Sequence, residues 1–237
     1  MAKANLSEWS ELVLNMVDNG VIKTEKVKNT MLNVDRQYYV PGPFDPYLDT
    51  ALPIGFGATI NAPHMHAMVL ELLKDHLAPG ASALDVGSGS GYLTACMALM
   101  VGPTGLVVGI DHIAHLVQLA QRNILNGNSF LLGWDSIIFR TADGRLGYPE
   151  NAPYDAIHVG AATQNVPSIL LEQLAPGGRL VVPVGNRKTY QILMQVDKSL
   201  DGKIQKKRIS AVRFVHLTDI TSQGKRASQI TLNDVCG

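Results

Sequence analysis

Short apolar runs alternate with amphipathic stretches through the middle of the chain. The runs of strand length cover residues 82–86, 106–110, 136–140, 155–159 and 179–184. Helical spacing of apolar residues occupies the intervals at 92–100, 113–125 and 166–174. Strands and helices that alternate in this way specify a parallel sheet with helices on both faces. We therefore expect an α/β fold with a doubly wound, mostly parallel sheet.

The first 80 residues show a helical pattern instead. Ser7 is placed to cap a helix that ends at Asn19-Gly20, and Thr24 is placed to cap a second one. The proline-rich stretch 39–47 predicts irregular structure that continues to about residue 62, and a helix follows Pro63. Its expected buried face holds Met65, Met68, Val69, Leu72 and His76, and Pro79-Gly80 is expected to end it.

The C-terminal part departs from the alternating pattern. Residues 190–196 and 204–214 read as a hairpin, which predicts an antiparallel edge on the sheet, and the basic cluster 203–208 suits a solvated edge strand. We expect one compact domain in three parts. These are an N-terminal helical segment that covers the substrate (1–80), a cofactor-binding core (81–220) and a loose tail (221–237).

Composition narrows the classes of protein. Hydrophobic residues make up 46% and charged residues 17%, which excludes a largely disordered chain. Lys+Arg and Asp+Glu number 20 each, so no basic excess points to nucleic acid. Two cysteines make no disulfide framework, and neither a signal pattern nor a membrane-length apolar run is visible. We expect a cytosolic protein that binds neither membranes nor nucleic acid, and a monomer because no coiled-coil pattern suggests assembly.

A glycine loop between the first core strand and its helix is the most informative motif. Gly87, Gly89 and Gly91 allow tight turns, and the helix start presents free N–H groups. The G-x-G-x-G spacing differs from the dinucleotide pattern, and no G-K-[ST] of a phosphate-binding loop is present. Asp85 beside the loop would repel a pyrophosphate and attract a cationic cofactor such as S-adenosylmethionine.

Two further acids follow the next two strands. Asp111 can accept hydrogen bonds from both ribose hydroxyls, and Asp143, before Gly144, can reach an adenine amino group. Each aspartate alone could instead cap a loop or helix. Three acids after three successive strands, beside this glycine loop, favour a cofactor site.

These residues resemble class I S-adenosylmethionine-dependent methyltransferases, and a closer resemblance is to the protein-L-isoaspartate (D-aspartate) O-methyltransferase family. It rests on the segments Ile54–Ala67, Leu84–Gly91, Ala142–Arg145, Tyr154–Ala162, Gly177–Leu180 and Leu217–Asp219. The resemblance runs from about residue 6 to about residue 223 and implies a Rossmann-like methyltransferase fold. It also implies methyl transfer to the α-carboxylate of L-isoaspartyl residues, and more weakly to D-aspartyl residues, in damaged proteins, with S-adenosylhomocysteine as product.

The resemblance implies cofactor contacts at several of these motifs. The residues implied are Ala58, Thr59, Ile60, Asn61, His66, Asp85, Gly87, Ser90, Gly91, Asp111, Asp143, Gly144, Thr218 and Gln223. No metal is expected, because His64 and His66 are two residues apart and diverge on a helix.

Asn61 stands where the family usually has its active-site serine. Its side chain could cap the helix after Pro63, or it could orient the substrate carboxylate as an amide donor. A third interpretation is a non-catalytic or altered S-adenosylmethionine-binding protein. A nucleobase or amine methyltransferase is the enzyme rival, although His158–Ala162 lacks the polar clamp of those enzymes.

The chemistry requires little acid–base help. A carboxylate of pKa about 3.9 is already ionised at neutral pH, so alignment of oxygen, methyl carbon and sulfur is the protein's task. The Thr59–His66 segment is expected to close over the site.

Overall fold

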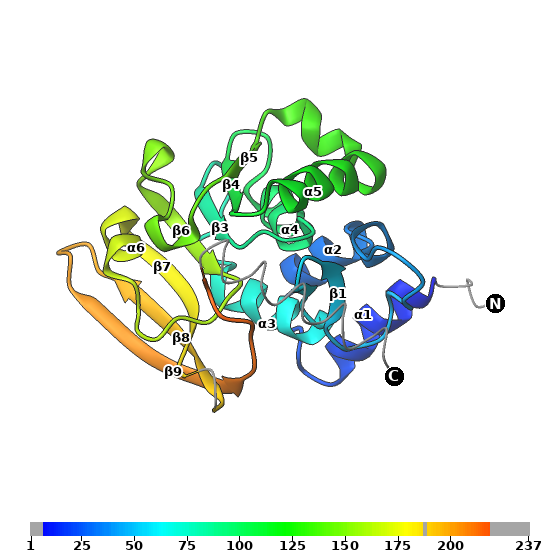
Figure 1. Cartoon of the computed structure of the whole chain (residues 1–237), viewed down its shortest axis with the longest axis horizontal. Coiled ribbons are helices and arrows are strands. Elements are labelled where there is room, and N and C mark those ends of the chain that lie inside the picture. Colours follow the sequence, from blue (N-terminus) through cyan, green and yellow to red (C-terminus); the bar gives the residue numbers. More distant parts are fainter. Residues whose placement is uncertain (1–6, 187–188, 219–237) are drawn as a thin grey trace.

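A seven-stranded sheet forms the centre of the molecule (Figure 1), in a computed structural model that describes residues 7–186 and 189–218. The strands follow the order β5-β4-β3-β6-β7-β8-β9. Their bounds are β3 (Ser82–Val86), β4 (Leu106–Asp111), β5 (Ile137–Thr141), β6 (Tyr154–Val159), β7 (Leu174–Val184), β8 (Gln191–Lys198) and β9 (Ile204–Val212). The pairs from β5 to β7 are parallel, and β8 and β9 add an antiparallel edge. The expected α/β fold is confirmed.

Side chains alternate between the two faces of the sheet and form two cores. Ala83, Val107 and Val181 face a large core shared with five helices, whereas Leu84 and Val108 face a smaller one. The helices of the large core are α1 (Glu8–Asp18), α2 (Glu25–Asn33), α3 (Pro63–Leu73), α4 (Tyr92–Val101) and α5 (Ala114–Gly127). The smaller core packs against α6 (Ser168–Gln173), next to the 3-10 helices η3 (Gly144–Leu146) and η4 (Pro149–Asn151).

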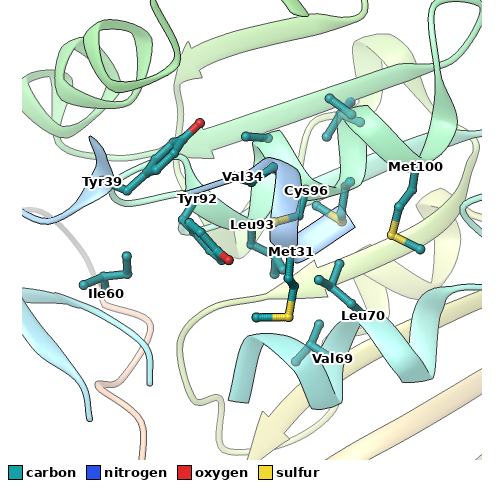
Figure 2. Packing of buried hydrophobic residues seen from close by; sticks show 14 of the residues in the cluster. Met31, Val34, Tyr39, Ile60, Val69, Leu70, Tyr92, Leu93, Cys96 and Met100 are labelled. Carbon is teal, nitrogen blue, oxygen red and sulfur yellow. The ribbon is translucent and has the colours of Figure 1, made fainter. Parts of the chain in front are cut away.

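Helix α4 lies at the centre of the large core. Figure 2 shows its Tyr92, Cys96 and Met100 among side chains from α2 and α3. Nearly every residue of α4 is buried, which explains why its sequence shows no polar face. The helix that follows the glycine loop is therefore held firmly on all sides.

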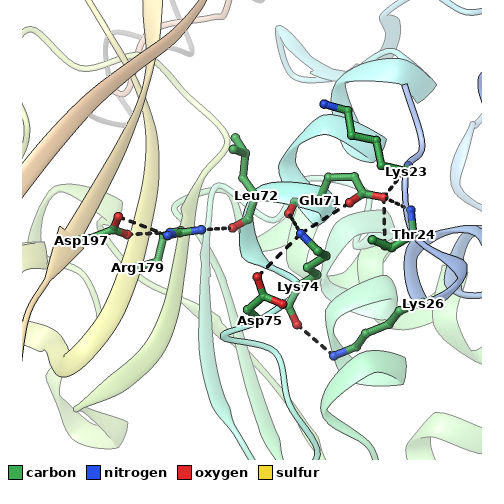
Figure 3. A network of polar contacts seen from close by, with 9 residues as sticks. All are labelled: Lys23, Thr24, Lys26, Glu71, Leu72, Lys74, Asp75, Arg179 and Asp197. Atoms are coloured by element: carbon green, nitrogen blue, oxygen red, sulfur yellow. Dashed lines mark hydrogen bonds and ion pairs between the residues drawn. The ribbon is translucent and has the colours of Figure 1, made fainter. Parts of the chain in front are cut away.

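The predicted start of α1 is confirmed, and that of α2 is only half right. The Ser7 hydroxyl accepts from the Ser10 N–H at 3.2 Å and caps α1. Thr24 occupies the N-cap position of α2, but its side chain makes no cap hydrogen bond. Its hydroxyl donates to Glu71 instead, at 3.0 Å, and the same carboxylate accepts the Lys23 and Thr24 N–H groups (Figure 3). This contact joins α2 to α3.

The expected buried face of α3 is partly right. Val69 is buried, and Met65, Met68 and Leu72 are partly buried and pack against the large core. The fully buried residues are Pro63, His66, Ala67, Val69, Leu70 and Leu73, most of which the sequence pattern did not single out. Apolar residues surround this helix, and its contacts with α2, α4 and β7 decide which of them are covered. The helix also ends at Leu73 rather than at Pro79-Gly80.

A short antiparallel hairpin precedes α3 where irregular structure was expected. Strands β1 (Leu52–Gly55) and β2 (Ala58–Ile60) pair across Phe56 and Gly57, which have φ angles of 55° and 68°. Positive φ at both central residues is typical of a tight hairpin turn. Because β2 leads directly into α3, the hairpin determines where Asn61 lies.

Arg179 links the antiparallel edge of the sheet to the helical layer. Arg179 on β7 donates from Nε to Asp197 at 2.6 Å and from Nη1 to the Leu72 carbonyl at 2.8 Å (Figure 3). The predicted hairpin is confirmed, with β8 ending at Lys198 and β9 at Val212. The predicted tail lies outside the described residues, and the domain boundaries stay predictions.

Candidate active site

The glycine loop turns sharply between β3 and α4. Gly87, Gly89 and Gly91 have φ angles of 79°, 52° and 82°, in the region that favours glycine. The Gly87 and Ser88 N–H groups donate to the Ile110 carbonyl at 2.8 and 3.0 Å, which fastens the loop to β4. Gly91 is the N-cap of α4 and offers no capping side chain, so the start of the helix is available to a polar ligand.

A cleft opens beside this loop, at the carboxyl ends of β3, β4 and β6. It encloses about 540 Å³, counting space continuous with solvent, which is the size of a small-ligand site. Its lining comprises Ala58, Thr59, Gly87, Gly89, Ile110, Asp111, His112, Gly144, Gly160, Ala161, Val215, His216, Leu217 and Thr218. The strand order reverses between β3 and β6, and such switch points are where open α/β sheets bind ligands. We call this space the main cleft.

Asp111 lies at the end of β4 with its carboxylate in the main cleft. One oxygen accepts from the Gly89 N–H at 3.2 Å and the other from the Ile113 N–H at 3.0 Å. Burial raises the pKa of Asp111, and these two N–H groups act in the opposite direction. Each oxygen keeps a lone pair for a further donor, as a ribose hydroxyl would require.

Asp143 is oriented differently. Its carboxylate accepts from Arg145, at 2.6 Å from Nη2, and also caps η3. The hydrogen bond from Arg145 holds the pKa of Asp143 below its usual value. Gly144 lines the main cleft and Asp143 does not, so the backbone at this position is closer to the cleft than the acid is.

A second space adjoins the main cleft and shares Thr59, Gly87, Gly89 and Gly160 with it. It encloses about 330 Å³. Its other lining residues are Ile60, Asn61, His66, Asp85, Ser88, Ser90, Tyr92, Leu93 and His158. We call this space the inner pocket. The structure therefore brings together, around two adjoining spaces, most of the residues that the sequence singled out.

Asp85 is committed to partners inside the protein. One oxygen accepts from the Thr94 hydroxyl at 2.6 Å, and the other pairs with His158 Nδ1 at 2.8 Å. The Asp85 side chain is almost fully buried, so its charge acts through His158 and the pocket wall rather than by open contact. Sequence reasoning assigned His158 no role, and its place near the end of a central strand was the only signal.

Several buried polar groups at these spaces have no hydrogen-bond partner within the part of the chain that the structure describes. They are His66 Nδ1, Ser88 Oγ and Thr218 Oγ1. Burial, and then the charges of Arg36 and His158, lower the pKa of His66 well below its usual value, so His66 is neutral at physiological pH. An unsatisfied buried group costs about 1–3 kcal/mol, and such groups are expected where a ligand supplies the partner. A polar nucleoside-type ligand fits this wall.

Asn61 does not cap α3. Ala62 is the N-cap residue, and no side-chain cap bond is formed, because Asn61 ends up one position too early and faces the inner pocket. The Asn61 carbonyl accepts from Arg36 Nη1 at 2.7 Å, and Arg36 Nη2 reaches the Thr50 carbonyl at 3.1 Å. Arg36 is fully buried, and burial lowers its pKa to about 10. Sequence reasoning missed this buried cation behind position 61.

Comparison with known proteins decides the family. Residues 7–222 match the family described as "Protein-L-isoaspartate(D-aspartate) O-methyltransferase (PCMT)". The chain belongs to this family. A wheat (Triticum aestivum) protein-L-isoaspartate O-methyltransferase is 52% identical over 224 residues, covering 94% of this chain and 96% of the relative. One from Caenorhabditis elegans is 48% identical over 217 residues, covering 92% and 95%.

A solved structure extends the likeness to three dimensions. A Plasmodium falciparum putative protein-L-isoaspartate O-methyltransferase, in complex with S-adenosyl-L-homocysteine, superposes with a TM-score of 0.82 and 37% identity. The match covers 90% of this chain and 99% of the other. The chain is thus an O-methyltransferase of the isoaspartate family, and the rival nucleobase or amine methyltransferase interpretation finds no support.

Within this isoaspartate O-methyltransferase the remaining predicted contacts can be placed. Ala58 and Thr218 line the main cleft, Ile60 and Ser90 line the inner pocket, and Gly91 begins α4. Gln223 lies outside the described residues. The assignment of individual residues to the cofactor stays a prediction. No helix in the described part of this isoaspartate O-methyltransferase is both long and apolar enough to span a membrane.

Proposed function

We propose that this protein transfers a methyl group from S-adenosylmethionine to the α-carboxylate of L-isoaspartyl residues, and more weakly to D-aspartyl residues, in damaged proteins. One observation carries the proposal beyond family membership. A nucleoside-sized cleft at the glycine loop adjoins a second pocket that Asn61 helps to line. A donor and an acceptor could therefore meet between these two spaces.

The chain offers a separate group for each part of the donor. Asp111 would accept from the ribose hydroxyls, and the backbone at Gly144 would approach the adenine. The unsatisfied His66, Ser88 and the N-terminus of α4 would meet the polar amino-acid end. When bound, S-adenosylmethionine supplies an electrophilic methyl group, whose bond to sulfur breaks with its electron pair left on sulfur as the new bond to oxygen forms.

The protein's own residues would act by position. The acceptor carboxylate is ionised at neutral pH, so no group of the chain needs to take a proton from it. The Asn61 amide can donate to one carboxylate oxygen in the inner pocket. Correct alignment of this kind can lower a barrier by several kcal/mol, on the order of 7 or more. Arg36 holds the Asn61 backbone in place.

The segment Thr59–His66 is expected to exclude water by closing over the site, since Thr59, Asn61 and His66 all line it. Limited proteolysis with and without S-adenosylhomocysteine tests this. Slower cleavage of the segment in the presence of the ligand is expected, and equal rates would contradict closure.

The proposal includes a monomer that acts in the cytosol on damaged proteins, without nucleic acid or membrane. Equal numbers of basic and acidic residues give no general attraction to nucleic acid. Cys96 is buried and has no disulfide partner among the described residues, in keeping with a reducing compartment.

Paired peptides test the proposal. Radiolabelled S-adenosylmethionine is incubated with an isoaspartyl peptide and its aspartyl twin, and labelled methanol is collected after the ester decays. Label on the isoaspartyl peptide alone is expected. Label on nucleic acid, or donor binding without transfer, would contradict it. The same assay on Asn61→Ser and Asn61→Ala variants tests whether the side chain of residue 61 acts as a hydrogen-bond donor. Serine can still donate a hydrogen bond to the carboxylate, whereas alanine cannot.

A further inference from the structure

A third space lies on the outer side of Asn61 and was not part of the site described above. It encloses about 730 Å³, counting space continuous with solvent, between the start of α3 and the chain that leaves β9. Figure 1 shows that this chain turns back from β9 toward α3. The lining comprises Asp49, Thr50, Ala51, Asn61, Ala62, His64, Met65, Tyr190, Ala211, Val212, Arg213 and Phe214. We call it the outer groove.

The outer groove is continuous with the transfer site through one residue. Asn61 lines the inner pocket on one side and the outer groove on the other. An acceptor carboxylate in the inner pocket would therefore carry the rest of its peptide past Asn61. The neighbouring residues of an extended chain follow at about 3.3 Å each, so the groove lies where they must go.

The groove has both apolar and charged parts. Met65 and Phe214 are partly buried and supply apolar wall, while the Tyr190 side chain is 62% exposed. The guanidinium carbon of Arg213 lies 4.5 Å from the centre of the Tyr190 ring. Stacking on a ring holds a guanidinium in place and leaves its N–H edge available.

The charges of the groove are asymmetric. Asp49, which also lines the groove, accepts from both the backbone N–H and the ring Nδ1 of His64, at 3.0 and 2.9 Å, so this acid is already engaged. Among the described residues no carboxylate pairs with Arg213. A cation that is held in place and unpaired, at the rim of a groove, matches a carboxylate from outside.

We infer that the outer groove holds the peptide segment next to the isoaspartyl residue, and that Arg213 selects an acidic side chain within that segment. The inference rests on the proposed function and adds a substrate preference to it. Tyr190 acts as the platform that holds the guanidinium, so it is a positioning residue. The occupant is the peptide of the damaged protein itself, recognised by the charge of one neighbouring Asp or Glu.

Steady-state methylation of matched peptides tests this. One isoaspartyl peptide is made with Glu, Gln or Lys in turn at each of about three positions on either side of the damaged residue, since an extended segment of that length spans roughly 10 Å. At one of these positions the Glu peptide is expected to have a KM about 3- to 10-fold below that of the Gln peptide, the size of a partly exposed charge-assisted contact. The Lys peptide is expected to bind weakest.

Three variants distinguish a specific contact in the outer groove from a general effect of protein charge on peptide binding. Arg213→Gln is expected to abolish the difference between the Glu and Gln peptides, and Tyr190→Leu to reduce it. Arg208→Gln is the control, because it removes the same charge from an exposed position on β9 that does not line the groove. This variant is expected to keep the difference in KM between the Glu and Gln peptides. Survival of the preference in Arg213→Gln, or its equal loss in Arg208→Gln, overturns the inference.

Different results overturn the substrate preference and the transfer reaction. Methylation of every isoaspartyl peptide with the same KM overturns the preference and leaves the transfer reaction intact. Failure to methylate any isoaspartyl peptide overturns the proposed function and the preference with it.

Discussion

Replacing Arg36 by methionine tests how the acceptor residue is held. Arg36 donates to the Asn61 and Thr50 carbonyls and is fully buried. Methionine has a similar length and fills the same space without charge or N–H groups. The variant therefore removes the two hydrogen bonds while disturbing the packing little.

The magnitude follows from two opposing terms. Burial lowers the pKa of Arg36 from 12.5 to about 10. This shift corresponds to a cost of about 3 kcal/mol for holding the charge in the native state at neutral pH, and Arg36→Met relieves it. Two carbonyls left without donors cost about 1–3 kcal/mol each. The expected change in the free energy of unfolding thus lies between a gain of about 1 kcal/mol and a loss of about 3 kcal/mol. Activity is expected to fall further, because a shift of Asn61 by about 1 Å can reduce kcat about 100-fold.

Urea unfolding and methylation kinetics on the same preparations measure both quantities. Arg179→Met serves as a matched control, since Arg179 also binds a backbone carbonyl, that of Leu72, but lies away from the site. It is expected to lower stability and leave kcat unchanged. If Arg36→Met is folded at the assay temperature and keeps the kcat and KM of the parent protein, anchoring of Asn61 by Arg36 plays no part in the reaction.

Three further predictions concern the loop, the inner pocket and the main cleft. Gly91→Ala is expected to lower the free energy of unfolding by about 2–4 kcal/mol, because a Cβ at φ 82° would lie 2.9 Å from that of Ala120. Gly102→Ala, with a similar φ of 69° and open space, should cost only the backbone strain, so equal losses would argue against the clash. The pKa of His66 is lowered, so the unfolded chain takes up this proton first as the pH falls, and stability is lost below pH 6.5. The free energy of unfolding, measured at several pH values, should depend less on pH in His66→Gln than in the parent protein. An unchanged pH dependence would refute the assignment of this stability loss to His66. Asp111→Asn is expected to raise the Kd for S-adenosylhomocysteine about 10- to 100-fold by calorimetry, and an unchanged Kd would remove Asp111 from the ribose site.

Local sequence signals predicted the core of the fold and much of the main cleft. The buried runs that became β3, β4 and β6 have strand length and are flanked by glycine or aspartate, so their ends were visible in the sequence. Parallel strands share one carboxyl edge, and for that reason Gly87 and Asp111 were expected to meet, as they do through Gly89 and the Ile110 carbonyl. Backbone geometry and periodicity are enough for predictions of this kind.

The same local sequence signals did not predict contacts between segments that are distant in the chain. The β1–β2 hairpin is short and has Phe56, which is not a usual turn residue, at a position with positive φ. The sequence therefore contains no turn pattern that predicts this hairpin. The buried side of α3 depended on which neighbours packed against it. The interpretation of Asn61 as a helix cap failed because the helix begins one residue later.

The sequence by itself determined that this protein is an α/β methyltransferase with a glycine loop and an acid at the end of the second core strand. Each of those features depends on residues close together in the chain. Only the tertiary structure decided that Asp85 pairs with His158, that Arg36 holds the carbonyl of Asn61, and that Arg213 lies over Tyr190 beside the same asparagine. These partners are far apart in sequence, and the energy of a hydrogen bond or a stacked ion depends on distance and burial, which exist only after the chain has folded.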